Sequence, residues 1–142
     1  MRVREFLFSV LNRAFFGRHA VYRLHGAEFY LDRFMPTNEE LYAEVERCKA
    51  AGDLPAAVEK LMILIQQDPR HALSHSTLAV YLGKLGRHEE AIRHALEVCE
   101  LEPNDPFSFT ALSVTYVRAG RIPEAEDAKA RASMVQARQS PR

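Results

Sequence analysis

The sequence of 142 residues lacks tryptophan, has only two cysteines and carries no net formal charge. A neutral chain exerts little long-range attraction on polyanions, so we expect no nucleic-acid partner. Cys48 and Cys99 both fall within helical patterns, where a thiol behaves as a small apolar group. We therefore expect two buried thiols that stay reduced, as in the cytoplasm.

Long apolar runs are also missing. The uninterrupted runs are far shorter than the roughly 20 residues that a membrane-spanning helix needs. The N-terminal stretch MRVREFLFSVLNRAFFGR begins with basic residues, as a signal peptide does, but Glu5, Asn12 and Arg13 interrupt its apolar part. Because no small-residue cleavage site follows, the sequence predicts a soluble chain that keeps its N-terminus.

Motifs for catalysis are absent as well. The sequence contains no G-x-x-x-x-G-K, no G-x-S-x-G and no C-x-x-C. His71 and His75 have the i, i+4 spacing that can present two imidazoles to zinc, but no suitable third ligand lies nearby in the sequence. His88 and His94 are expected to face solvent. We predict no catalytic residues, no metal and no cofactor.

What the sequence does contain is a period of 34 residues. Glycine, alanine and proline each return at this interval, as Gly52, Gly86 and Gly120; Ala57, Ala91 and Ala125; and Pro69 and Pro103. Apolar residues before each glycine follow one helical face, and a second apolar stripe follows it. Such a repeat predicts pairs of helices that stack on one another.

Each recurring residue suits one place in a helical hairpin. Glycine can end the first helix, because the chain there adopts a left-handed backbone that a Cβ would oppose. Pro55 and Pro123 fall where the second helix begins, and proline is tolerated at a first helical position. The small alanine lets the paired helices approach closely. Pro69 and Pro103 end the second helix before the next hairpin starts.

These columns resemble the tetratricopeptide repeat family, whose unit is a 34-residue helix–turn–helix. Three units match, at 38–71, 72–105 and 106–137, followed by a short tail at 138–142. The family's tryptophan column holds Leu41, His75 and Phe109, and Ala137 stands where a proline is expected. The resemblance implies an all-α, right-handed solenoid of antiparallel helix pairs.

Residues 1–36 lack the signature but keep part of its apolar frame. Subtracting 34 from the packed positions of the first unit gives Leu7, Leu11 and Ala14, and then Leu24, Ala27 and Tyr30. We therefore predict a degenerate fourth helix pair, roughly 3–16 and 20–34. The segment holds eight of the thirteen aromatic residues. They are interpreted as a core or cap of the solenoid, a surface for a partner or for homo-oligomers, or, least favoured, a membrane-surface helix.

The first helices of stacked pairs line a concave groove. In proteins that resemble this family, the groove commonly holds a peptide. Residues one step from the packed columns should face it, and these are Tyr42, Glu46, Lys49, Leu73, Thr77, Val80, Lys84, Phe107, Thr110, Val114 and Arg118, joined by Phe8, Asn12 and Phe15 if the N-terminal pair exists.

The composition of this face favours binding of a protein or peptide partner. Leu73, Val80, Phe107 and Val114 are apolar residues on a face that should otherwise be wet. The alternative is that another helix of the same chain covers them. Family members that grip the C-terminal carboxylate of a chaperone use Lys, Asn and Arg, but the corresponding places here hold Tyr42, Glu46, Thr77, Phe107 and Ala111. We expect instead a segment with apolar anchors and a basic or mixed flank that meets Glu46 and Lys84 or Arg118.

Three functions are compatible with this pattern. The leading hypothesis is a non-enzymatic adaptor or scaffold that binds a partner segment in the groove. The second is a small chaperone of the secretion type that holds one client. The third is a structural protein that assembles with itself through residues 1–36.

Overall fold

The computed structural model describes residues 21–24, 27–30 and 36–140. It divides the chain into two units, Met1–Thr37 and Asn38–Arg142.

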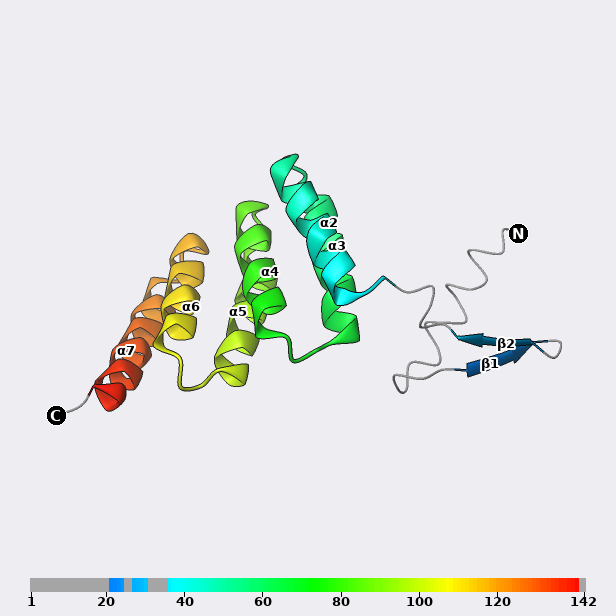
Figure 1. The fold of residues 1–142 in the computed structure, drawn as a ribbon. Helices are drawn as coiled ribbons and strands as arrows, with labels where there is room; N and C mark the ends of the chain where they lie inside the picture. Colours follow the sequence, from blue (N-terminus) through cyan, green and yellow to red (C-terminus); the bar gives the residue numbers. More distant parts are fainter. Residues whose placement is uncertain (1–20, 25–26, 31–35, 141–142) are drawn as a thin grey trace. The chain divides into compact units, whose positions relative to one another are not determined.

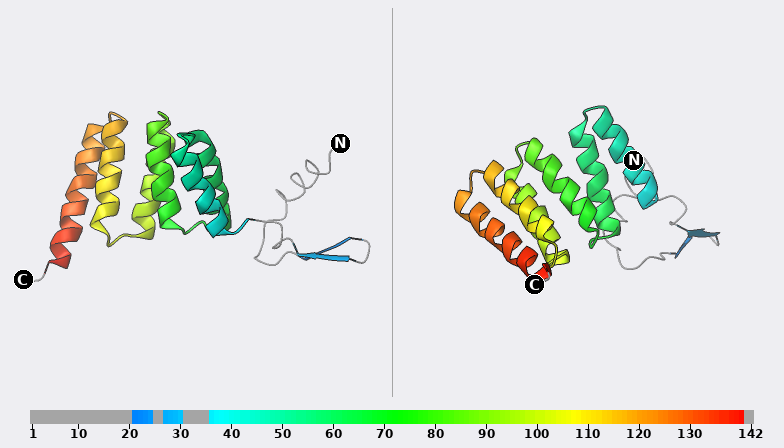
Figure 2. Two further views of the ribbon diagram at one scale, coloured as in Figure 1. Left: turned by 45° about the horizontal axis from the view of Figure 1, so that its top comes forward. Right: turned by 60° about the vertical axis from the view of Figure 1, so that its left-hand side comes forward.

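The second unit consists of three helical hairpins. Figures 1 and 2 show them side by side in chain order. Each helix packs on the next one along the chain, and α4 also packs on α6. The bounds are α2 Asn38–Ala50 and α3 Leu54–Gln67, α4 Ala72–Lys84 and α5 His88–Leu101, and α6 Pro106–Arg118 and α7 Ile122–Gln139. Helix α7 runs two residues past the end expected at 137.

The turn within each hairpin follows from its glycine. Gly52, Gly86 and Gly120 have φ values of 75°, 76° and 75°, the left-handed backbone that glycine adopts without steric cost. Around Gly86, the Arg87 N–H donates to the carbonyl of Leu82 at 2.9 Å, which ties the chain back to α4. The predicted role of the repeated glycine is confirmed.

Helix starts and ends also agree with the repeat. Pro55 and Pro123 lie in the first turns of α3 and α7, where a missing N–H costs no hydrogen bond. The Asp53 side chain caps α3 by accepting from the Ala56 N–H at 3.1 Å. Pro69 and Pro103 stand two residues beyond α3 and α5, so the following hairpin starts afresh.

The core is divided unevenly along the unit. Its larger part joins α2, α3, α4 and α5 through long side chains, among them Leu41, Leu61, Leu64, Leu78 and Leu82. The part that joins α4 to α7 contains mostly small residues, Ala79, Ala95, Cys99, Leu112 and Ala128. The repeated Ala57, Ala91 and Ala125 are each at most 1% exposed, which explains why these positions stay small.

The two thiols differ in burial. Cys99 is buried between helices, whereas Cys48 is half-buried. Burial raises the pKa of the Cys99 thiol to about 11, which keeps it protonated at neutral pH. The prediction of two buried thiols is therefore correct for Cys99 and only partly so for Cys48.

The first unit contains a β-hairpin where a helix was predicted. Strands β1 (Val21–Leu24) and β2 (Ala27–Tyr30) pair antiparallel, with Val21 opposite Tyr30 and Leu24 opposite Ala27. The prediction of one helix across 20–34 is therefore wrong. Val21, Tyr22, Phe29 and Tyr30 are residue types that favour strands, and the sequence places Gly26, a poor helix former, between the two runs.

The remaining predictions for this unit lie outside the described residues. They are the helix at 3–16, the groove residues Phe8, Asn12 and Phe15, and self-association through residues 1–36. In the described residues, no helix is long and apolar enough to cross a membrane.

Candidate functional site

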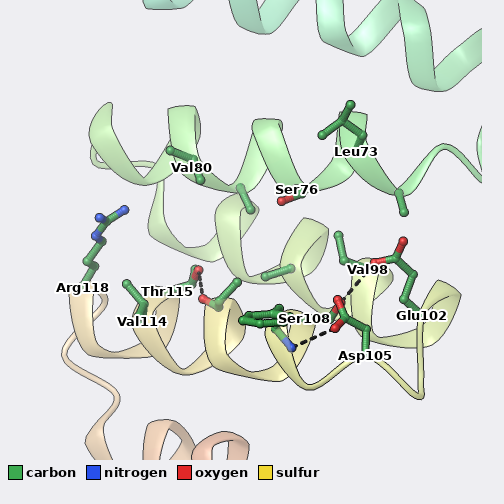
Figure 3. Close-up of a pocket in the computed structure, with 15 residues that line it drawn as sticks. Leu73, Ser76, Val80, Val98, Glu102, Asp105, Ser108, Val114, Thr115 and Arg118 are labelled. Carbon is green, nitrogen blue, oxygen red and sulfur yellow. Dashed lines mark hydrogen bonds between the residues drawn. The ribbon is translucent and has the colours of Figure 1, made fainter. Parts of the chain in front are cut away.

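An apolar pocket of about 420 Å³ opens between α4, α5 and α6 (Figure 3). Four large apolar side chains that line it are exposed, at 79% for Phe107, 61% for Leu73, 46% for Val114 and 40% for Val80. Leu73 and Val80 come from α4, and Phe107 and Val114 from equivalent places on α6. Exposed apolar groups that converge on one cavity are typical of a binding surface.

Small residues form the rest of the apolar lining. Ser76 and Ala79 come from α4, Ala95 from α5 and Ala111 from α6. Their short side chains leave the space between α4 and α6 that longer ones would fill. The pocket therefore depends on small residues at least as much as on its large ones.

One end of the pocket is acidic. Glu102 follows the last residue of α5, and Asp105 caps α6 by accepting from the Phe107 N–H at 3.1 Å. The buried Ser108 hydroxyl lies 3.1 Å from Asp105 Oδ2 and 3.2 Å from Glu102 Oε2. A hydroxyl has one proton, so it can donate to only one of these carboxylates at a time.

The other end is basic. Arg118 lines the pocket from the last turn of α6. Its guanidinium lies above Gly83 of α4, where a Cβ would be 4.0 Å from Arg118 Nη1. Among residues 36–140, no carboxylate lies within ion-pair distance of Arg118. Lys84 is exposed at the equivalent place at the end of α4.

Five of the groove residues expected from the sequence line this pocket, namely Leu73, Val80, Phe107, Val114 and Arg118. Thr77 and Thr110 do not line it, and their hydroxyls donate to the carbonyls of Leu73 and Pro106 on their own helices. Lys84 is exposed but is not among the lining residues either.

The three expected groove residues of α2 lie elsewhere. The Tyr42 hydroxyl is 2.8 Å from Ser74 Oγ and 3.1 Å from His71 Nδ1, so it joins α2 to the start of α4. Glu46 is already paired with Lys49, at 3.1 Å. The sequence predicted that Glu46 would meet a basic or mixed flank of the partner segment, but Lys49 of the same helix already pairs with it.

Ala111, which the sequence placed in the groove at a clamp position, also lines the pocket. Sequence reasoning did not identify the other lining residues, which are Ala72, Ser76, Ala79, Ala95, Val98, Glu102, Asp105, Ser108 and Thr115. The first helix of each hairpin presents one edge to the preceding hairpin and another to the following one. Apart from the equivalent pairs Leu73 and Phe107, and Val80 and Val114, α4 and α6 therefore line the pocket with residues from different positions of the repeat. The alternation of small residues in ALSHSTLAV and PFSFTALSV was the available signal for these positions.

His71, His75 and His94 have structural roles. His71 caps α4 by accepting from the Ser74 N–H at 3.2 Å. His75 is 7% exposed, and its Nδ1 lies 3.0 Å from His94 Nδ1, so the prediction that His94 faces solvent is wrong. In the described part of the chain, no three His, Cys, Asp or Glu side chains gather as metal ligands would.

Comparison with known proteins places this fold. No family model matches the sequence. Among curated proteins, the chain is similar to the small glutamine-rich tetratricopeptide repeat-containing protein 2 of Mycosarcoma maydis, with 27% identity over 97 residues. The match covers 68% of this chain but only 28% of that protein, so the chain spans little more than a quarter of its relative's length.

Solved structures with the same architecture are more distant in sequence. MamA (MSR-1) superposes with a TM-score of 0.64 at 22% identity, over 72% of this chain and 59% of that chain. The TPR2B domain of yeast Sti1, in a complex with pHsp70, gives 0.63 at 24% identity, over 71% and 81%. The predicted resemblance to the tetratricopeptide repeat family and the solenoid of three helix pairs are confirmed.

Proposed function

We propose that this chain, which has three hairpins of the tetratricopeptide-repeat fold, binds a segment of a partner polypeptide in the apolar pocket between α4, α5 and α6. The observation that carries the proposal is the convergence of Leu73, Val80, Phe107 and Val114 on one cavity while they stay 40–79% exposed. Leaving these groups in water costs free energy that a partner's apolar side chains would recover.

We infer an adaptor role without catalysis. Asp105 and Ser108 have structural roles in the pocket, because Asp105 caps α6 and the Ser108 hydroxyl donates to Asp105 or to Glu102. The solved Sti1 domain is a complex with pHsp70, which supports a binding role for this architecture.

The first test replaces Val80 and Val114 together by Asp. Both side chains are 40–46% exposed, so we expect the helical content to stay the same, while the buried-charge cost of binding should reduce partner capture from lysate at least tenfold. The matched control is Met134→Asp on α7, an apolar residue that is 61% exposed and does not line the pocket. Equal capture by all three proteins would contradict the proposal.

The two alternative functions predict different partners. A client-specific chaperone would co-purify with a single protein that is insoluble without it. Self-assembly would appear in light scattering as a complex that disappears when residues 1–36 are removed.

A further inference from the structure

We propose that the partner segment is bipolar, with a cationic group that meets Glu102 and Asp105, apolar side chains in the middle, and a carboxylate that meets Arg118. This inference rests on the proposed function and specifies the chemistry of the segment. It follows from the order of charges along the pocket.

The order can be followed in Figure 3. Leu73 lies at the end of the pocket that holds Glu102 and Asp105, while Val80 and Val114 lie toward Arg118. The sequence of surfaces is therefore acidic, apolar and basic. A bound segment placed along α4 and α6 would meet them in that order.

The acidic end has acceptor capacity that the fold does not use. Within the described residues, two donors reach these carboxylates. The buried Ser108 hydroxyl has one proton and lies 3.1 Å from Asp105 Oδ2 and 3.2 Å from Glu102 Oε2, and the Phe107 N–H donates to Asp105 Oδ1 at 3.1 Å. An ionised carboxylate has about four lone-pair sites. Two neighbouring carboxylates with so few donors form a site for an ammonium or guanidinium group.

The basic end differs from the other basic residues at hairpin ends. Arg87 pairs with Glu90 at 2.6 Å, and Arg121 pairs with Glu124 at 2.7 Å. Arg118 has no such partner among residues 36–140 and lines the pocket. A carboxylate of the partner segment would pair with Arg118, because a guanidinium donates two parallel hydrogen bonds to a carboxylate.

The dimensions fit a short segment. Asp105 and Arg118 are separated by the length of α6, about 20 Å at 1.5 Å per residue. An extended chain covers that distance in about six residues at 3.3 Å each. Leu73 and Val80 are seven residues apart along α4, as are Phe107 and Val114 along α6. On each helix the two apolar side chains therefore lie about 10 Å apart.

The test is a selection of random dodecapeptides, displayed on phage, against the full chain. We expect enriched peptides to carry Lys or Arg at one end, Asp or Glu at the other, and apolar residues between. A segment could bind in either chain direction, so the readout is whether the two ends of the enriched peptides carry opposite charges. Peptides with like charges or none at both ends would overturn the bipolar inference and leave the proposed function standing.

Two charge variants sharpen the selection. With Arg118→Glu we expect enriched peptides to become basic at both ends. With Glu102→Lys, which leaves Asp105 to offset the new lysine, we expect the preference for a basic residue at that end to disappear. A bipolar peptide from the first selection should lose about tenfold in affinity for Arg118→Glu, which turns attraction into repulsion, and less for Glu102→Lys, which only cancels the attraction. The matched controls are Arg131→Glu and Glu100→Lys, exposed residues outside the pocket, which should change neither result.

Two other outcomes separate the proposals. If the selection enriches no peptide on the native chain beyond the level on the Val80→Asp/Val114→Asp variant, then the proposed function fails together with this inference. If the native chain instead forms a dimer that Val114→Asp dissociates in sedimentation, a second copy occupies the pocket and the bipolar segment is wrong.

Discussion

At the residue scale, Gly83 and Gly86 lie three residues apart but are under different constraints. Gly83 lies inside α4, and a Cβ built there would find its nearest neighbours 4.0 Å away, at Ala91 Cβ and Arg118 Nη1. Gly86 has φ +76° and nothing within 4 Å of its Cβ position. The constraint at Gly86 is therefore its backbone conformation and not space.

These differences predict opposite effects of the same substitution. Gly83→Ala should stabilise the fold by about 0.5–1 kcal/mol, because alanine fits and loses less backbone entropy. Gly86→Ala should destabilise it by about 1 kcal/mol, because a left-handed backbone opposes a Cβ. Urea unfolding of the two variants measures both. Shifts of the same sign would contradict this account of the turn.

Also at the residue scale, a pair of histidines joins α4 to α5. His75 Nε2 donates to the carbonyl of Pro69 at 2.9 Å, so in the neutral ring Nδ1 accepts from His94 Nδ1–H at 3.0 Å. Burial lowers the pKa of His94 below its usual 6.5, and the nearby His75 and Arg93 lower it further, while Glu90 and Glu97 act in the opposite direction.

The lowered pKa predicts how stability depends on pH. Between the pKa of about 6.5 in the unfolded chain and the lowered pKa of His94 in the folded chain, the unfolded chain binds a proton that the folded chain does not, so the free energy of unfolding should decrease as pH falls through this window. Paired carboxylates such as Glu44 and Glu90, whose pKa values are lowered below 4.5, contribute at lower pH. His94→Asn should flatten the profile just below pH 6.5, where the lowered pKa of His94 acts. If the free energy of unfolding of that variant changes with pH as steeply as in the native chain, then His94 is not the cause of the pH dependence.

At the scale of the element, the sequence predicted the repeats well because single residues fix where each helix starts and ends. The starts of α2, α4 and α6 at Asn38, Ala72 and Pro106 agree with the predicted units. The turns follow from glycine and the stops from proline. The prediction of a helix across 20–34 failed because it depended on only three apolar positions. Two of these, Leu24 and Ala27, are cross-strand partners in the β-hairpin.

The candidate site was only partly accessible to the same reasoning. Counting in steps of 34 located Leu73 with Phe107 and Val80 with Val114, because these occupy the same column. It could not show that α4 and α6 turn different edges toward one pocket. Nor could it show that Glu102, just beyond α5, reaches a cavity lined mainly by α4 and α6.

The uneven core predicts that the third hairpin is the least stable of the three. Long leucines bury the contacts of α2 and α3. In the α6–α7 hairpin, α6 contributes Leu112 and the partly buried Phe109 and Tyr116, but α7 contributes only Ala128 to the core cluster. Since burial of apolar area drives folding, the α6–α7 hairpin should open with less free energy than the α2–α3 hairpin. Stability in repeat proteins is roughly the sum of such local terms.

Hydrogen exchange of individual amides tests this order. We expect buried-core amides of α6 and α7, such as those of Leu112 and Ala128, to exchange about tenfold faster than those of Leu61 and Leu64 in α3. Comparison with the other terminal hairpin controls for the fraying expected at either end of the repeats. Equal protection of the two hairpins would show that the small residues pack as effectively as the large ones.

At the scale of the whole unit from Asn38 to Arg142, repetition provides both the fold and the pocket. Each hairpin buries its apolar stripe on the next, but the exposed apolar side chains of α4 and α6 face one another across small residues. The opposite charges of Glu102 and Arg118 then give the pocket a direction. The central claim is that a polypeptide binds there.

Methyl NMR of the native chain, titrated with a peptide from the selection, tests that claim most directly. We predict that the methyl resonances of Leu73, Val80 and Val114 shift with one common affinity, while those of Leu96 on α5 and Met134 on α7, which are exposed but do not line the pocket, stay unchanged. Shifts confined to Leu96 and Met134, with the pocket methyls unmoved, would contradict the account.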